Sequence, residues 1–114
     1  MRRGKTRKFG LEKSERKALL KSLATALIDN GKIKTTRAKA KTLSSFTDRL
    51  VTKAKKGDVP ARRMLLKSIG SKAVIKLIKE IAPKYTTRAG GYTRVIRLDR
   101  RKSDGAEMAL IEFV

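Results

Sequence analysis

The chain has 114 residues and a formal net charge of +21, from 31 lysine and arginine residues against 10 aspartate and glutamate residues. So large an excess repels itself in a compact state unless an anion neutralises it, and nucleic acid is the first partner class to consider. The length predicts one domain. Its core is built mainly from aliphatic side chains, because 39% of residues are hydrophobic and only 4% are aromatic.

The composition disfavours several other classes of protein. Tryptophan is absent and no apolar run is long enough to cross a bilayer, so we expect no membrane partner. The basic start lacks the apolar segment of a signal peptide, and the lack of cysteine fits a reducing interior, so we expect a cytoplasmic protein. Histidine is also missing and the carboxylates are scattered. We therefore expect no enzyme, cofactor, metal site or small-molecule substrate.

Residues 1–12 form a basic arm. We expect it to be flexible in the free protein, because only Phe9 and Leu11 are able to join a core. Its charge suggests contact with nucleic acid, and a solvated tail is the alternative. The arm residues assigned to binding are Arg2, Arg3, Lys5, Arg7 and Lys8.

Residues 13–82 are predicted to contain four helices and one short strand. Ser14 is the expected N-cap of the first helix, which ends at Asn30-Gly31. Its apolar residues recur with helical spacing and predict one buried stripe. They are Leu20, Leu23, Ala24, Leu27 and Ile28.

The second helix is predicted over residues 37–55, with Thr35 or Thr36 as its cap. The β-branched residues just before it indicate a short strand near Ile33. Its buried stripe is Ala40, Leu43, Phe46, Leu50 and Ala54, and its outward residues are Arg37, Lys41, Asp48 and Lys55.

A third helix is expected to begin at Asp58 and Pro60, since proline fits the first turn of a helix. A fourth is expected to begin with Ser71 as its cap, and Pro83 is expected to close the helical region. The core residues predicted for these two helices are Met64, Leu65, Ile69, Val74, Leu77, Ile78 and Ile81.

Residues 92–113 are predicted to form a C-terminal hairpin with strands at 92–98 and 107–113 and a basic tip at the turn signal Asp104-Gly105. The short strand of the helical region is able to complete a three-stranded sheet, with the helices on one face. The predicted fold is therefore α+β, as a single domain over residues 1–114.

The basic residues fall in separated groups, which suits RNA that folds around a protein better than a single recognition helix on duplex DNA. Beyond the arm, the residues assigned to RNA binding are Arg16, Lys17, Lys34, Thr35, Thr36, Arg37, Lys39, Lys41, Arg62, Arg88, Gly90, Gly91, Tyr92, Arg94, Arg97, Arg100, Arg101 and Lys102.

One of these groups, residues 88–94, combines cations with two adjacent glycines and a tyrosine. Gly90 and Gly91 would allow RNA to approach the backbone closely, and Tyr92 would stack on a base or sugar. The alternative is that the glycines only shape the joint between the helices and the hairpin.

Two stretches, IKTTRAKAK at residues 33–41 and RAGGYTR at residues 88–94, resemble the bacterial large-subunit ribosomal protein seventeen family. The resemblance covers nearly the whole chain. It implies an α/β domain that binds 23S-type ribosomal RNA near the peptide exit side, among neighbouring ribosomal proteins. Family members often carry histidine near the start of the arm and of the first helix. Arg3 and Glu15-Arg16 stand there in this chain, so no histidine contact with RNA is implied.

Two other interpretations remain open at the level of the sequence. A free nucleoid protein would bind duplex DNA of any sequence without partner proteins. A purely protein-binding basic module would not bind RNA.

Overall fold

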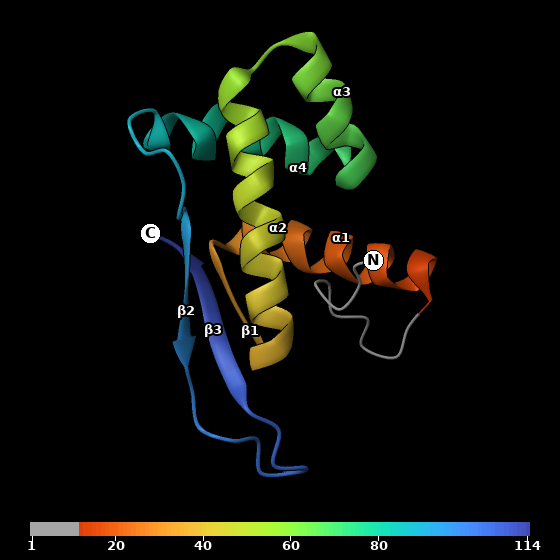
Figure 1. Cartoon of the computed structure of the whole chain (residues 1–114), viewed down its shortest axis with the longest axis vertical. Coiled ribbons are helices and arrows are strands. Elements are labelled where there is room, and N and C mark those ends of the chain that lie inside the picture. Colours follow the sequence, from red (N-terminus) through yellow and green to blue (C-terminus); the bar gives the residue numbers. More distant parts are fainter. Residues whose placement is uncertain (1–11) are drawn as a thin grey trace, which may run out of the picture.

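The structure, a computed structural model, describes residues 12–114. The arm residues Arg2, Arg3, Lys5, Arg7 and Lys8 therefore lie outside the described residues. The elements are α1 (Lys13–Asn30), β1 (Lys32–Thr36), α2 (Arg37–Lys56), α3 (Val59–Ser68), α4 (Ser71–Lys76), the π-helix η1 (Leu77–Ile81), the 3-10 helix η2 (Ala82–Tyr85), β2 (Thr93–Arg97) and β3 (Met108–Phe113) (Figure 1).

The three strands form one antiparallel sheet in the order β1-β3-β2, so the last strand of the sequence is the central one. This confirms the predicted α+β fold, including the pairing of the short strand with the hairpin. α2 packs on one face of the sheet (Figure 1), where Thr93 of β2 donates to the Asp48 carboxylate of α2 at 3.1 Å. The other face carries the rows Lys32–Glu112–Arg94 and Lys34–Leu110–Ile96, since directly paired residues share a face.

The hydrophobic core lies between this sheet and the helices. Most of the predicted apolar stripes are buried in it, and Phe46 and Ile78 are half-buried against it. Its largest fully buried side chains are Tyr92, Leu27, Ile28, Leu43, Leu65, Ile69, Leu77, Ile111, Val51, Val74 and Thr47. In residues 12–114, no helix is long and apolar enough to cross a membrane.

Met64 is an exception, because its side chain is 44% exposed. The buried side of α3 is formed by Ala61 and Leu65, four residues apart. Met64 lies about 100° away from Leu65 around the helix axis, so the prediction that it packs inward was wrong.

Two predicted helix starts are confirmed, and each has a side-chain cap. The Thr36 hydroxyl accepts from the Lys39 backbone N–H at 3.4 Å at the start of α2. The Asp58 carboxylate accepts from the Ala61 N–H at 2.9 Å at the start of α3, with proline in the first turn. In both helices a side-chain oxygen at the N-cap thus accepts a hydrogen bond from a first-turn backbone N–H that has no acceptor within the helix.

The two serine caps were wrong. α1 begins one residue before Ser14, and its N-cap position is Glu12, whose side chain makes no capping hydrogen bond. α4 begins at Ser71 itself, after Gly70 in extended conformation. In both places the serine lies within the first turn, because the backbone enters the helix earlier than the side-chain preference indicates.

The helical region also continues past Pro83. After α4 the helix widens into η1 and then tightens into η2, which ends at Tyr85. Pro83 occupies the first turn of η2, where a missing N–H costs no hydrogen bond. The expectation that the helices end before this proline was therefore wrong.

Candidate nucleic-acid interface

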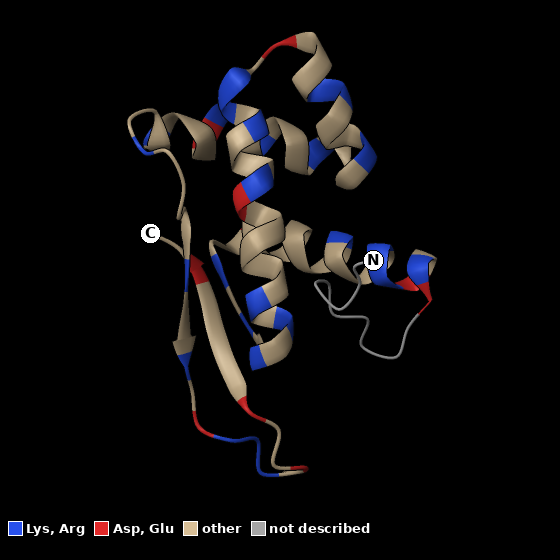
Figure 2. Ribbon diagram, in the orientation of Figure 1, with Lys and Arg blue, Asp and Glu red and all other residues tan. Residues whose placement is uncertain are grey.

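The cations of the protein are spread over the helices and the two outer strands, whereas β3 carries none (Figure 2). All four ion pairs among residues 12–114 join an arginine assigned to RNA binding to an acidic residue in β3 or in the loop before it. They are Arg37 with Glu107 (3.5 Å), Arg94 with Glu112 (2.5 Å), Arg100 with Glu107 (3.2 Å) and Arg101 with Asp104 (2.8 Å).

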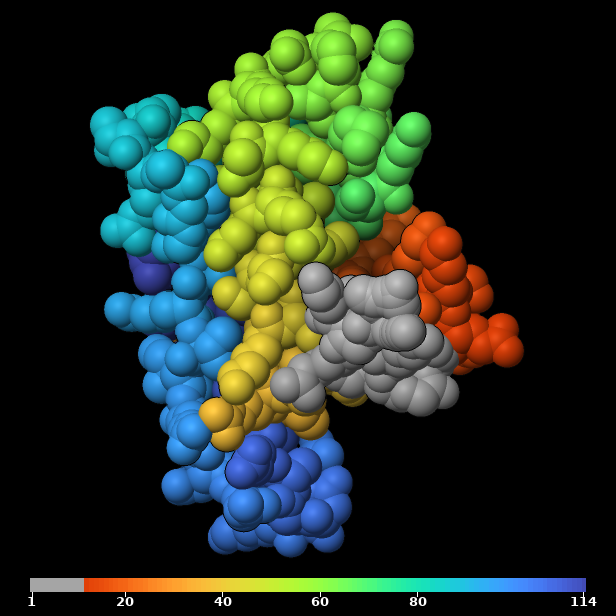
Figure 3. Space-filling view, in the orientation of Figure 1, coloured from red at the N-terminus to blue at the C-terminus, as the bar shows by residue number. Residues whose placement is uncertain are grey.

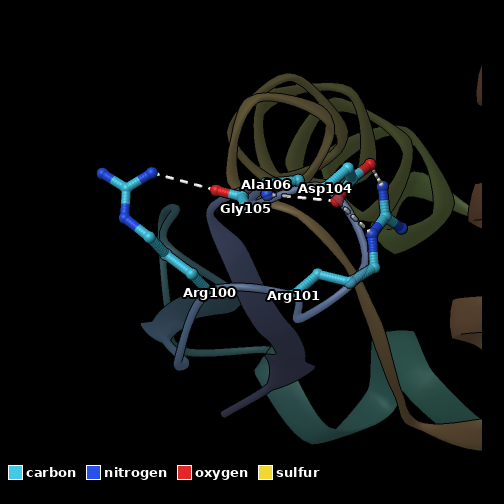
Figure 4. Close-up of polar contacts among 5 residues, drawn as sticks. All are labelled: Arg100, Arg101, Asp104, Gly105 and Ala106. Carbon is cyan, nitrogen blue, oxygen red and sulfur yellow. Dashed lines mark hydrogen bonds and ion pairs between the residues drawn. The ribbon is translucent and has the colours of Figure 1, made fainter.

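The loop between β2 and β3 forms the lower end of the molecule in Figure 3, and contacts among its own residues fix its shape. Both Arg101 Nε and Nη2 donate to the Asp104 carboxylate, at 2.9 and 2.8 Å, and Arg100 donates to the Gly105 carbonyl at 2.9 Å (Figure 4). The Ala106 N–H also donates to Asp104. The Arg101 hydrogen bond, followed by that of Ala106, lowers the pKa of Asp104 from 3.8 to about 2. The loop is therefore a preformed structure whose two guanidinium groups extend to opposite sides (Figure 4).

A cavity of about 420 Å³ lies where this loop meets the sheet face opposite α2. We call it the hairpin cavity. It is lined by Lys34, Leu98, Asp99, Arg100, Arg101, Lys102 and Met108. The fold thus brings a cation of β1 beside three cations of the loop, which the sequence placed in separate groups.

At the junction between β1 and α2, some of the residues assigned to RNA binding stabilise the fold and others are exposed. Thr36 caps α2, and Thr35 is half-buried opposite Ala109 of β3. Lys39 is half-buried, whereas Lys34 and Lys41 are exposed. The two lysines are therefore the accessible cations of this group.

The stretch from Arg88 to Arg94 forms the joint between η2 and β2. The ammonium of Lys55 donates to the Arg88 carbonyl, and the Arg88 guanidinium donates to the Gly91 carbonyl at 3.0 Å. Gly91 has φ +63°, which favours glycine, whereas Gly90 has no such restriction. Both glycines, Arg88 and Arg94 are exposed, so this joint has an accessible surface.

Tyr92 does not belong to that surface. Its side chain is fully buried, and its ring packs at a tilt against Tyr85 with 5.2 Å between the ring centroids. Its hydroxyl lies within hydrogen-bonding distance of Thr52, Lys55 and Arg88, and the bonds from Thr52 and Lys55 lower its pKa. The prediction that this ring stacks on RNA is incompatible with its position in the core.

Two residues of α2 also differ from their predicted orientation. Asp48 and Lys55 face β2 and the joint, rather than solvent. Burial raises the pKa of Asp48, although hydrogen bonds from Thr93 and the neighbouring backbone oppose this. Helical spacing alone could not reveal that a strand covers this side of α2.

A second basic cluster lies between α1, α2 and α3, around the half-buried Phe46. Lys17, Lys21 and Lys67 line a cavity of about 310 Å³ there. Only Lys17 was assigned to binding. Lys21 lies one turn further along α1, whereas Lys67 of α3 becomes a neighbour only in the fold. Arg16 is half-buried, whereas Arg62, Arg97 and Lys102 are exposed.

Among the described residues there is no group of three or more histidine, cysteine, aspartate or glutamate side chains that could hold a metal ion. The accessible chemistry is that of ammonium and guanidinium groups beside aliphatic side chains, which suits a polyanion.

The family model and the relatives found by comparison with known proteins all indicate the same protein family. Residues 19–114 match the family model described as ribosomal protein L17. The proteins named "Large ribosomal subunit protein bL17" from Persephonella marina and Campylobacter jejuni strain RM1221 are 53% and 51% identical, over 98% and 95% of this chain and 93% of each relative. The protein of that name from Symbiobacterium thermophilum is 49% identical, over 96% of this chain and 98% of its own length.

Proposed function

Since the chain belongs to the ribosomal protein L17 family, we propose that it binds and stabilises the 23S-type RNA of the large ribosomal subunit. Family membership makes it a structural constituent of the bacterial large subunit, acting in translation in the cytoplasm and not as an enzyme. The proposed location is the peptide exit side, where it contacts neighbouring large-subunit proteins.

The observation that carries the RNA proposal is the distribution of cations around the fold. Exposed lysine and arginine side chains lie on α1, α2, α3 and both outer strands, and further ones lie on the loop between β2 and β3 (Figure 2). A duplex touches a small domain on one side, whereas folded RNA surrounds it. A charge of +21 on so short a chain also needs a large number of neutralising phosphates.

Competition binding tests this proposal. The full chain is titrated with large-subunit ribosomal RNA and with duplex DNA at equal phosphate concentration, over a series of salt concentrations. We expect ribosomal RNA to be preferred and the logarithm of its affinity to fall with the logarithm of salt with a slope of several units, as about ten phosphate contacts require. Equal affinity for DNA would favour a nucleoid protein, and no retention on RNA would favour a protein-binding module.

Two variations extend the test. Removal of residues 1–10 is expected to weaken RNA association while circular dichroism and melting of the free protein stay nearly unchanged. Crosslinking in cells, followed by identification of the attached RNA and protein segments, tests the location. Crosslinks confined to RNA remote from the exit would contradict the proposed position.

A further inference from the structure

The hairpin cavity combines an apolar floor with a cationic rim. Leu98 and Met108 come from adjacent strand ends, joined by the hydrogen bond from the Leu98 N–H to the Met108 carbonyl at 3.0 Å. Leu98 is 38% exposed and Met108 is 9% exposed. The floor is thus apolar, with most of its exposed surface from Leu98, and it lies at the end of the sheet face that α2 leaves open.

The rim carries more positive than negative charge. Asp99 is the one carboxylate among seven lining residues, against four cations. Arg100 and Arg101 are paired with Glu107 and Asp104, which fixes the loop. Lys34 and Lys102 form no ion pair with a described residue and are exposed, so their ammonium groups are available to an anion.

We propose that the hairpin cavity binds a single unpaired nucleotide of RNA, which rests on the proposed RNA-binding function. Its base or ribose lies on Leu98 and Met108, and its phosphate accepts from Lys34 and Lys102. The volume of about 420 Å³ falls within the ~300–1,000 Å³ of small-ligand sites. Arg100 and Arg101 act as positioning residues, because their ion pairs with Glu107 and Asp104 fix the loop beside the cavity.

An unpaired nucleotide fits this site better than a duplex. A duplex presents phosphates and groove edges with its bases stacked inside, and it leaves an apolar floor without a partner. A nucleotide turned out of a loop presents an apolar ring face together with a phosphate. The charge of the rim also argues against an apolar peptide as the occupant.

Methionine methyl resonances give a direct test. The chain contains Met1, Met64 and Met108, and among the described residues Met64 lies on α3 and does not line the cavity. With 13C-methyl methionine in the full chain, a short single-stranded oligouridylate is expected to shift the Met108 resonance and leave Met64 in place. An RNA duplex with the same number of phosphates is expected to bind without moving Met108.

Substitutions with equal charge change provide the control. Lys34→Gln with Lys102→Gln should weaken oligouridylate binding at least about tenfold, since each removes a charge-assisted hydrogen bond. Lys72→Gln with Lys79→Gln removes two exposed lysines outside the cavity and should weaken binding much less. All four positions lie on the surface or at the partly open sheet face, so folding is expected to persist.

The outcomes are distinguishable. If the oligouridylate binds while Met108 does not move, or if both double variants weaken binding equally, the cavity proposal fails and RNA binding stands. If a glutamate-rich peptide shifts Met108 as strongly as oligouridylate, the cavity is a general anion site and the nucleotide assignment fails. If neither ribosomal RNA nor oligouridylate binds, the proposed function fails as well.

Discussion

The ammonium of Lys55 lies 3.2 Å from the hydroxyl of Tyr92 and 5.3 Å from the centroid of its ring. The same ammonium donates to the Arg88 carbonyl. Lys55 of α2 thereby links the joint before β2 to a buried aromatic ring. Its ammonium is engaged in contacts within the protein, so we do not count it among the cations available to RNA.

Tyr92→Ala is therefore expected to destabilise the protein by about 3–5 kcal/mol, since it empties a large, fully buried site. Tyr92→Phe retains the ring and should cost only about 1 kcal/mol for the lost hydrogen bonds. Urea unfolding measures both. The RNA affinity of folded Tyr92→Phe should equal that of the unchanged protein. A marked loss of affinity would show that the Tyr92 hydroxyl contacts RNA.

Substitutions of the adjacent residues Gly91 and Gly90 provide a test of backbone strain and its control. A Cβ atom at either position meets nothing within 4 Å, but only Gly91 has positive φ, at +63°. Gly91→Ala should thus cost about 1–2 kcal/mol through backbone strain, whereas Gly90→Ala should change the free energy of unfolding by less than about 1 kcal/mol. If Gly90→Ala instead lowers RNA affinity at unchanged stability, close approach of RNA to this backbone is supported.

The pairing of Asp104 with Arg101 makes the hairpin loop sensitive to acid. The pKa of Asp104 is about 2 in the folded protein, below its value of about 3.9 in an unfolded chain. Its stabilising contribution is thus complete only above pH about 5, and it is lost progressively as the pH falls through about 3.9 to below about 2. A titration of the Asp104 carboxyl carbon by NMR measures this, and Arg101→Gln should raise the pKa toward 3.8.

A second hydrogen bond to Asp104 limits the expected change in its pKa. In Arg101→Gln, the Ala106 N–H still donates to Asp104, so the pKa should stop short of 3.8. An unchanged value near 2 would show that Arg101 does not pair with Asp104 in solution.

The carboxylate of Glu112 is expected to restrain RNA binding. It pairs with Arg94 at 2.5 Å, and the Arg94 side chain is 60% exposed. Glu112→Gln removes this competitor, so RNA affinity should rise and its dependence on salt should steepen by up to about one unit. Glu80→Gln removes the same charge at an exposed site with no ion pair among residues 12–114 and serves as the control. Equal gains from both variants would indicate an effect of net charge alone.

The sequence predicts those parts of the fold that depend on local spacing. Periodic apolar residues identify the helices, and the capping side chains of Thr36 and Asp58 mark two of their starts. The three-stranded sheet, which the short strand near Ile33 was expected to complete, is also confirmed. Ser14 and Ser71 mislead because a capping preference locates a helix end only to within a residue or two.

The interface is less predictable, because it depends on which segments meet. Tyr92 has the composition of an RNA-stacking residue, but the packing of Tyr85 and α2 around it decides otherwise. Likewise the sequence identifies Leu98 and Met108 only as apolar residues of the predicted strands, and the fold places them beside Lys34. Residue type does predict exposure in simple cases: Lys41 and Arg62, both assigned to RNA binding, are exposed.

The strand order has a consequence for how the chain folds. β1 and β2 have no hydrogen bonds to each other and both pair only with β3, which follows them in the sequence. During synthesis the helices are able to collapse first through local contacts, but the sheet closes only when the last strand arrives. Until that moment the backbone of β1 has unpaired donors and acceptors on both sides. We therefore expect the final strand to set the time at which the protein becomes competent for assembly.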